Sequence, residues 1–130
     1  MIELNNTNNP NPRQINSIAL EAFFNICKLW SLKSKEQMIL LGLEDKSSTF
    51  YKWKEDKSGI LHKDTLERIS YIIGIYKALQ ILFRDVSQAN VWIKKPNRVF
   101  SGKSALAVML GGNVVDIAVV RDYLDAQRGW

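Results

Sequence analysis

Gly102, Lys103 and Ser104 are the residues that most resemble a chemical motif, because Gly-Lys-Ser ends the phosphate-binding loop of many nucleotide hydrolases. That loop needs a further glycine at the position that Asn97 occupies, and it needs a buried strand before it. Residues 94–96 are instead Lys-Lys-Pro. The motif lacks its supporting parts, and the sequence therefore excludes nucleotide hydrolysis.

The other reactive residue types are too few, or too poorly spaced, for catalysis. The acidic pairs at residues 44–45 and 55–56 are neighbours in polar surroundings, which indicates solvated loops and not an acid/base couple. Cys27 falls within an apolar stripe, and His62 has no second metal ligand at a suitable spacing. We therefore expect a protein that is not an enzyme and has no metal site and no cofactor.

The net charge of +5 in 130 residues favours an anionic or acidic partner. Residues 69–130 hold most of the excess, with eight basic and four acidic side chains. The N-terminus lacks the basic and apolar regions of a signal peptide, and the longest apolar stretch, residues 69–83, is too short to span a membrane. A single cysteine excludes an internal disulfide. We expect a cytoplasmic protein without a membrane segment.

Apolar residues recur at helical spacing along most of the chain, which predicts an all-α fold. Residues 1–12 are rich in Asn and Pro and are expected to form a flexible arm. Residues 13–30 then form a helix with one apolar face. That face consists of Leu20, Phe23, Phe24, Cys27 and Trp30.

Two short helices joined by a glycine turn are predicted next. Ser34 is a suitable N-cap for the first helix, and Gly42 can take the left-handed conformation that ends it. The second helix opens at residue 47 or 48 and buries Phe50 and Trp53, which are three residues apart. Short helix, glycine turn and short helix together are the helix-turn-helix pattern.

The second of these helices turns polar side chains outward, where they can bond to phosphates and base edges in a major groove. The start of the first helix adds two lysines that can reach the DNA backbone. The candidate DNA-binding residues are Lys33, Lys35, Ser48, Thr49, Tyr51, Lys52 and Lys54. The alternative is a helical hairpin whose outer face is merely solvated, since the acidic pairs at residues 44–45 and 55–56 repel phosphate.

A long helix over residues 63–84 has a broad apolar arc, so it is expected to be buried between other helices and to join two halves of the protein. Short helices at 87–93 and 104–110 follow, separated by a break at Pro96-Asn97. Asn113 caps a final helix that ends near residue 126. A strand competes for residues 114–120, but the apolar spacing over some fourteen residues favours helix.

The C-terminal part combines an aromatic pair, a Pro-Asn break, a Phe-x-Gly-Lys loop and a closing glycine pair. The residues are Trp92-Ile93, Pro96-Asn97, Phe100, Gly102-Lys103, Leu106 and Gly111-Gly112. On these residues, segment 89–130 resembles the toxin-binding domain of Xre/MbcA/ParS-type antitoxins. Ala105 departs from the family pattern, which often has Pro there. The preceding residues resemble the Xre-type N-terminal part, which gives a helix-turn-helix domain at 13–84 and a toxin-binding domain at 85–130.

This resemblance implies an antitoxin of a type II toxin–antitoxin pair whose partner is a RES-domain toxin, an enzyme that consumes NAD⁺. The antitoxin would do no chemistry itself, would obstruct the toxin's cleft, and would bind operator DNA as a homodimer to repress the shared promoter. The candidate toxin-binding residues are Lys95, Asn97, Arg98, Phe100, Lys103, Arg128, Gly129 and Trp130.

Two roles within that set stay open. Phe100 is either an anchor that enters the toxin or a plug folded back on its own helices. Trp130 either enters the toxin cleft, where its α-carboxylate would meet basic groups, or belongs to a frayed tail. A basic rim of the loop could match an acidic toxin face or contact DNA phosphates; its residues are Lys94, Lys95, Arg98 and Lys103.

Two other functions are compatible with the sequence. One is a stand-alone helix-turn-helix transcriptional regulator with a C-terminal dimerisation or ligand domain, which would bind an operator without a toxic partner. The other is a protein–protein adaptor whose helix-turn-helix no longer binds DNA.

Overall fold

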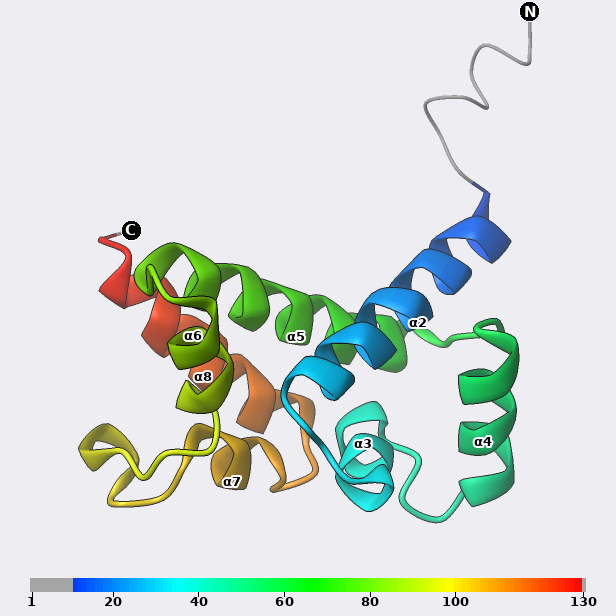
Figure 1. Cartoon of the computed structure of the whole chain (residues 1–130). Coiled ribbons are helices and arrows are strands. Elements are labelled where there is room, and N and C mark those ends of the chain that lie inside the picture. Colours follow the sequence, from blue (N-terminus) through cyan, green and yellow to red (C-terminus); the bar gives the residue numbers. More distant parts are fainter. Residues whose placement is uncertain (1–10, 130) are drawn as a thin grey trace, which may run out of the picture.

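The computed structural model describes residues 11–129 and contains only helices and connecting loops in this part of the chain (Figure 1). The elements are α2 (Pro12–Leu29), α3 (Ser34–Leu41), α4 (Ser47–Asp56), α5 (Lys63–Leu82), α6 (Val86–Trp92), the 3-10 turn η1 (Arg98–Phe100), α7 (Ala105–Met109) and α8 (Val114–Gln127). The predicted all-α fold is confirmed, and the final segment is a helix and not a strand. No helix within residues 11–129 has the length and apolar character to cross a membrane.

Helix α2 begins at Pro12, one residue before its predicted start. Proline suits the first helical position, and the Asn11 side chain accepts a hydrogen bond of 2.9 Å from the Gln14 backbone N–H. The Gln14 side chain in turn accepts one from the Asn11 N–H, which completes a capping box. The rest of the predicted flexible arm, residues 1–10, lies outside the described residues.

The two short helices form where the sequence predicts them, with one correction at the first. Lys33, and not Ser34, is the N-cap of α3, because the Glu36 carboxylate accepts a hydrogen bond of 2.8 Å from the Lys33 backbone N–H. Gly42 ends α3 in the left-handed conformation with a φ of 77°, as predicted. Helix α4 opens at Ser47.

Helix α5 runs across the molecule and is shared by its two halves (Figure 1). It packs against α2 and α3 in the N-terminal half, and against α6 and α8 in the C-terminal half. On the C-terminal side the crossing is close at Gly74, where an added Cβ would lie 2.0 Å from the Arg121 guanidinium. The broad apolar arc of this helix is thus explained by packing on both sides.

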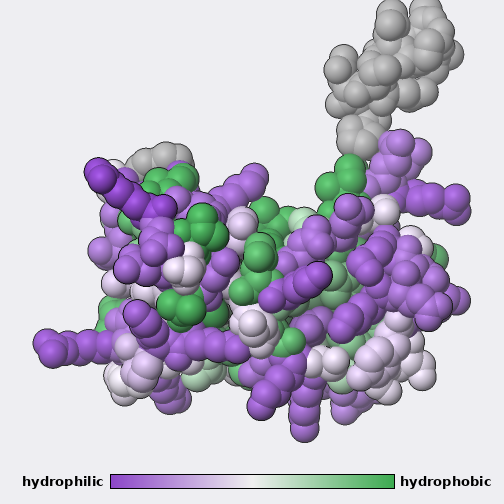
Figure 2. Space-filling view, in the orientation of Figure 1, coloured by the Kyte–Doolittle hydropathy of each residue, from purple (hydrophilic) through white to green (hydrophobic). Residues whose placement is uncertain are grey.

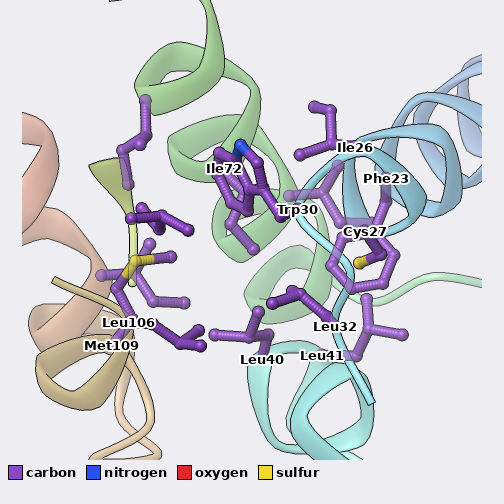
Figure 3. Close-up of a cluster of buried hydrophobic side chains, with 14 of the residues drawn as sticks. Phe23, Ile26, Cys27, Trp30, Leu32, Leu40, Leu41, Ile72, Leu106 and Met109 are labelled. Carbon is purple, nitrogen blue, oxygen red and sulfur yellow. The ribbon is translucent and has the colours of Figure 1, made fainter. Parts of the chain in front are cut away.

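One cluster of buried hydrophobic side chains extends through both halves. Figure 3 shows Trp30, which follows α2, together with Leu40 of α3, Ile72 of α5 and Met109 of α7 within it. All five residues of the predicted apolar face of α2 are buried. The helix-turn-helix unit therefore does not have a core separate from that of the C-terminal helices.

Candidate functional site

Helix α4 is held to the core by two aromatic side chains and presents its remaining faces to solvent. Phe50 is fully buried and meets Phe24 of α2 edge to face, with ring centroids 5.9 Å apart. Trp53 is buried one turn later. Gly42 sets the turn between α3 and α4. Its left-handed conformation is closed by a hydrogen bond of 2.8 Å from Leu43 N–H to Met38 C=O. Figure 1 shows α4 at one side of the molecule, far from α8.

The structure brings most of the predicted DNA-binding residues together on α4. Ser48, Tyr51 and Lys52 are exposed and share one face of the helix, while Thr49 is half-buried beside them. Lys54 differs, because its ammonium group lies over the ring of Phe50, 5.8 Å from the centroid. The two other candidates, Lys33 and Lys35, are exposed at the start of α3 and are not on α4.

An open groove of about 630 Å³ runs beside the same face of α4. Thr49 and Lys52 line it together with Lys46, which precedes the helix and is exposed. Sequence reasoning did not select Lys46, although a lysine directly ahead of two serines at a helix start is a usable signal for phosphate binding. The four carboxylates of residues 44–45 and 55–56 are also exposed, so they weaken the positive potential around α4.

The loop over residues 96–104 is a compact structure held by its own backbone. Asn97 N–H donates to Lys103 C=O, and Gly102 N–H donates to Asn97 C=O, both at 3.0 Å. The Asn97 side chain accepts from Val99 N–H, and Ser104 caps α7 by accepting from Ala107 N–H. Asn97 and Gly102 therefore shape the turn. The Gly-Lys-Ser sequence lies in this turn and has no preceding strand.

Phe100 is half-buried and packs on the C-terminal helix. Its ring meets Tyr123 of α8 edge to face at a centroid distance of 5.5 Å. Tyr123 in turn stacks on Trp92, with centroids 6.4 Å apart and ring planes at 6°. The side chains of Lys95, Arg98 and Lys103 are exposed, and none has an ion-pair partner in the part of the chain that the structure describes.

The end of α8 carries the last predicted toxin-binding residues. Arg128 is mostly buried against the helix, and its guanidinium lies 3.6 Å from the Asp125 carboxylate. Gly129 is exposed, with a φ of 84°. Trp130 lies outside the described residues.

A buried arginine that sequence reasoning missed joins the two halves. Arg68 of α5 donates from Nη2 to Gly112 C=O at 2.9 Å, and from Nη1 to the carbonyls of Ile39 and Leu40 at 3.3 and 3.4 Å. Its Nε bonds to Asp64 at 2.8 Å. The guanidinium thereby connects the end of α3 with the turn before α8. Sequence gives little signal for this role, since Arg68 follows a charged residue and looks like a solvated position.

The remaining reactive side chains have structural roles. Cys27 is buried, and burial raises the pKa of its thiol far above the ordinary value, so the thiol stays protonated and inert. Asp85 caps α6, and its hydrogen bonds from the Ser87 hydroxyl and backbone N–H lower the pKa of its carboxyl group. No group of three or more potential metal ligands occurs between residues 11 and 129.

Two family models match successive parts of the chain, and the two matches meet within α5. Residues 10–74 match the family described as the antitoxin Xre-like helix-turn-helix domain, and residues 78–129 match the antitoxin Xre/MbcA/ParS C-terminal toxin-binding domain. A curated relative, the uncharacterized protein y4oB of Sinorhizobium fredii, is 54% identical over 110 residues, which cover 85% of this chain and 84% of the relative.

Proposed function

The chain belongs to the Xre-like antitoxins, with a helix-turn-helix and a toxin-binding domain, and from this premise we propose that it neutralises a RES-domain toxin and represses its own operon. In this proposal the toxin is an NAD⁺-consuming enzyme. The antitoxin does no chemistry and acts by occupying the toxin's cleft. It binds the operator as a homodimer, as expected for a helix-turn-helix repressor.

The observation that carries the proposal is the separation of two exposed surfaces. The polar face of α4 lies at one side of the molecule, whereas the loop of residues 96–104 and the end of α8 lie at the other side (Figure 1). The first surface carries Tyr51 and Lys52, and the second carries Lys95, Arg98 and Lys103. One antitoxin molecule can therefore contact DNA and toxin at the same time.

On the toxin side, the proposed contacts are the exposed basic side chains of the loop and the tail that follows α8. Asn97 supports the loop from within, and Phe100 holds it against Tyr123. Arg128, Gly129 and Trp130 are proposed to reach the toxin's cleft, since Trp and Arg are frequent anchors of interfaces. A tail of this kind would reach the cleft only if the loop surface docks beside the cleft's opening.

Co-expression with the toxin encoded next to this gene tests the first half of the proposal. We expect the full chain to restore growth, and we expect deletion of Gly129 and Trp130 to weaken the rescue. Full rescue by the shortened chain would show that Gly129 and Trp130 are not needed to neutralise the toxin. If no neighbouring gene encodes a toxic protein, the alternative of a stand-alone regulator is favoured.

Lys52→Glu tests the second half. The charge reversal on the exposed face of α4 should abolish binding to the DNA upstream of the gene in a gel-shift assay, while neutralisation stays intact. Lys77→Glu, on an exposed position of α5 away from α4, is the matched control. Loss of neutralisation as well would show that Lys52 has a structural role.

A further inference from the structure

Helix α2 carries a second row of side chains, on the side that does not pack on the core. This outer row of α2 consists of Ile15, Ile18, Ala22, Asn25 and Leu29, at alternating steps of three and four residues. Such steps keep all five on one side of a helix, as in the seam between two paired helices. Ile15, Ile18 and Leu29 remain 44%, 63% and 46% exposed. The fold of one chain therefore leaves the outer row uncovered.

The outer row forms a continuous strip on the molecular surface. Helix α2 packs mainly against α5 and α4 through its buried face, and Figure 1 shows its first turns extending beyond the end of α5. Figure 2 shows hydrophobic surface at both ends of the course that α2 takes in Figure 1, beside the grey atoms and near the centre of the view. The row spans about 21 Å at 1.5 Å per residue. An exposed apolar strip of this kind marks an interaction site, whereas isolated apolar residues do not.

Two charged side chains lie along one edge of the outer row. Glu21 directly precedes Ala22, and Lys28 directly precedes Leu29, so that both lie on the same flank. Both are exposed, and neither forms an ion pair with any residue from 11 to 129. This edge thus presents one negative and one positive group about 10 Å apart along the helix.

The apolar positions of the outer row match those of a second α2 that runs in the opposite direction. When Ala22 of each copy faces Asn25 of the other, Ile18 of each copy faces Leu29 of the other, which gives an apolar layer at both ends. The small Ala22 allows the two helices to approach closely at their crossing. The two Asn25 amides lie beside the two-fold axis, where a polar pair fixes the register.

The charges of the edge decide between this arrangement and a parallel one. In the antiparallel register, Glu21 of each copy lies opposite Lys28 of the other, so the same ion pair forms twice. In a parallel pair, the position across from Glu21 is Ile26, and the charges stay unpaired. The edge is therefore self-complementary only when the two helices are antiparallel.

The other partners of this protein fit the outer row less well. A largely apolar strip with Glu21 at its edge offers no contact to phosphate groups. The match to the toxin-binding domain begins at residue 78, whereas α2 lies within the helix-turn-helix match of residues 10–74. A second copy of the chain is thus the occupant that the chemistry of the row favours.

We propose that two copies of this chain associate through the outer row of α2, as an antiparallel pair of helices. The contact is shorter than the interfaces of obligate dimers, so it gives a weak dimer that depends on protein concentration. Binding of both copies to one operator raises their effective concentration and strengthens the pair. The inference rests on the proposed function, since it places the interface of the homodimer that operator binding requires.

Ile18→Glu tests the apolar layers, and Ile81→Glu is the matched control. Ile81 is 62% exposed, which is close to the value of Ile18, but it lies on the last turn of α5. We expect Ile18→Glu to raise the Kd of the dimer at least about tenfold in sedimentation equilibrium, since a charge enters both end layers. The control should associate as the wild type does. If Ile18→Glu dimerises as tightly as the wild type, the inference is overturned, although the homodimer proposal stands.

A charge swap tests the register. Glu21→Lys and Lys28→Glu should each weaken self-association about tenfold, because two attractive pairs become two repulsive ones. The double variant Glu21→Lys/Lys28→Glu should restore the wild-type Kd. An equimolar mixture of the two single variants should also associate. If the double variant associates no better than the single variants, the antiparallel register is wrong.

Disulfide formation tests the direction of the helices. Ile18→Cys and Leu29→Cys chains should cross-link with each other when mixed and oxidised, and each alone should cross-link much less. The native Cys27 is buried and does not compete. Cross-links within each single variant, and none in addition on mixing, would indicate a parallel pair and overturn the inference.

The failure of this interface is distinguishable from the failure of the proposed function. A wild-type chain that stays monomeric at high concentration, yet binds operator DNA and neutralises the toxin, overturns the interface alone. A chain that dimerises as described, but neither binds DNA nor restores growth, overturns the proposed function and leaves the interface standing. If Ile18→Glu abolishes neutralisation and leaves self-association unchanged, the outer row serves the toxin and the inference fails.

Discussion

Replacement of Arg68 by methionine is expected to destabilise the protein strongly, because this one side chain holds backbone groups of both halves. Methionine keeps the length of the aliphatic stem and removes every donor. The Gly112 carbonyl would lose its charged donor at 2.9 Å, and the carbonyls of Ile39 and Leu40 would lose longer contacts. Methionine could still fill the space, so the loss measures the hydrogen bonds and not a cavity.

The magnitude follows from the burial of the partners. A hydrogen bond to a charged group contributes about 1.5–3 kcal/mol, and the short bond to Gly112 belongs to this class. The two longer bonds contribute less, and Ile39 C=O keeps its bond from Gly42 N–H. Asp64 is 59% exposed, so its ion pair with Arg68 contributes no more than about 1 kcal/mol. The sum is about 3 kcal/mol, or a melting temperature lower by about 10 °C for a chain of this size.

Urea and thermal unfolding followed by circular dichroism measure this change. Arg84→Met is the matched control, because Arg84 is an exposed arginine just after α5, and its loss should cost less than about 0.5 kcal/mol. Arg68→Lys should fall between wild type and Arg68→Met, since one ammonium group cannot reach all three carbonyls. If Arg68→Met is as stable as the Arg84→Met control, the network does not hold the halves together and the reasoning is refuted.

The remaining predictions concern three other side chains. Cys27 should resist alkylation in the folded protein at about pH 8, because burial raises the pKa of its thiol, and it should react fully in denaturant; mass spectrometry of the native protein detects any modification. The pKa of Asp85 is lowered by Ser87, so its stabilising effect is present above the ordinary carboxyl pKa of about 3.9 and disappears as the pH falls through the folded value; the melting temperatures of wild type and Asp85→Asn should therefore converge in acid, and a constant difference would contradict this. Phe100→Ala removes the contact with Tyr123 and should lower the free energy of unfolding by about 1–2 kcal/mol, given the half-buried ring. An unchanged free energy of unfolding would mean that this contact does not stabilise the fold, which favours the role of Phe100 as an anchor.

Sequence patterns predicted those parts of the structure that depend on local spacing. The apolar stripe from Leu20 to Trp30, the glycine turn at Gly42, and the buried pair Phe50 and Trp53 all follow from helical periodicity and capping chemistry. The predicted N-cap of α3 was wrong by one residue. Ser34 has a side chain suited to capping, but Lys33 holds the position because its backbone N–H donates a hydrogen bond to the Glu36 carboxylate.

Contacts between distant segments were not predictable in this way. Arg68 bonds to residues 28 to 44 positions away along the chain, and no local pattern distinguishes it from a solvated arginine. The stack of Trp92 on Tyr123 forms because α6 and α8 both pack against α5. The hydrogen bond from the Lys94 ammonium to Ser31 C=O likewise joins two segments that are 63 residues apart.

Because both halves pack against α5, recombination between related genes is constrained in the evolution of this protein. A recombination point near residue 84 would give a new C-terminal half to a helix shaped for the old one, with Gly74 matched to Arg121 and Arg68 matched to the turn at Gly112. Such a chimera would inherit a poorly fitting core. A change of toxin partner should therefore arise more easily through substitutions on the exposed C-terminal surface than through exchange of whole domains.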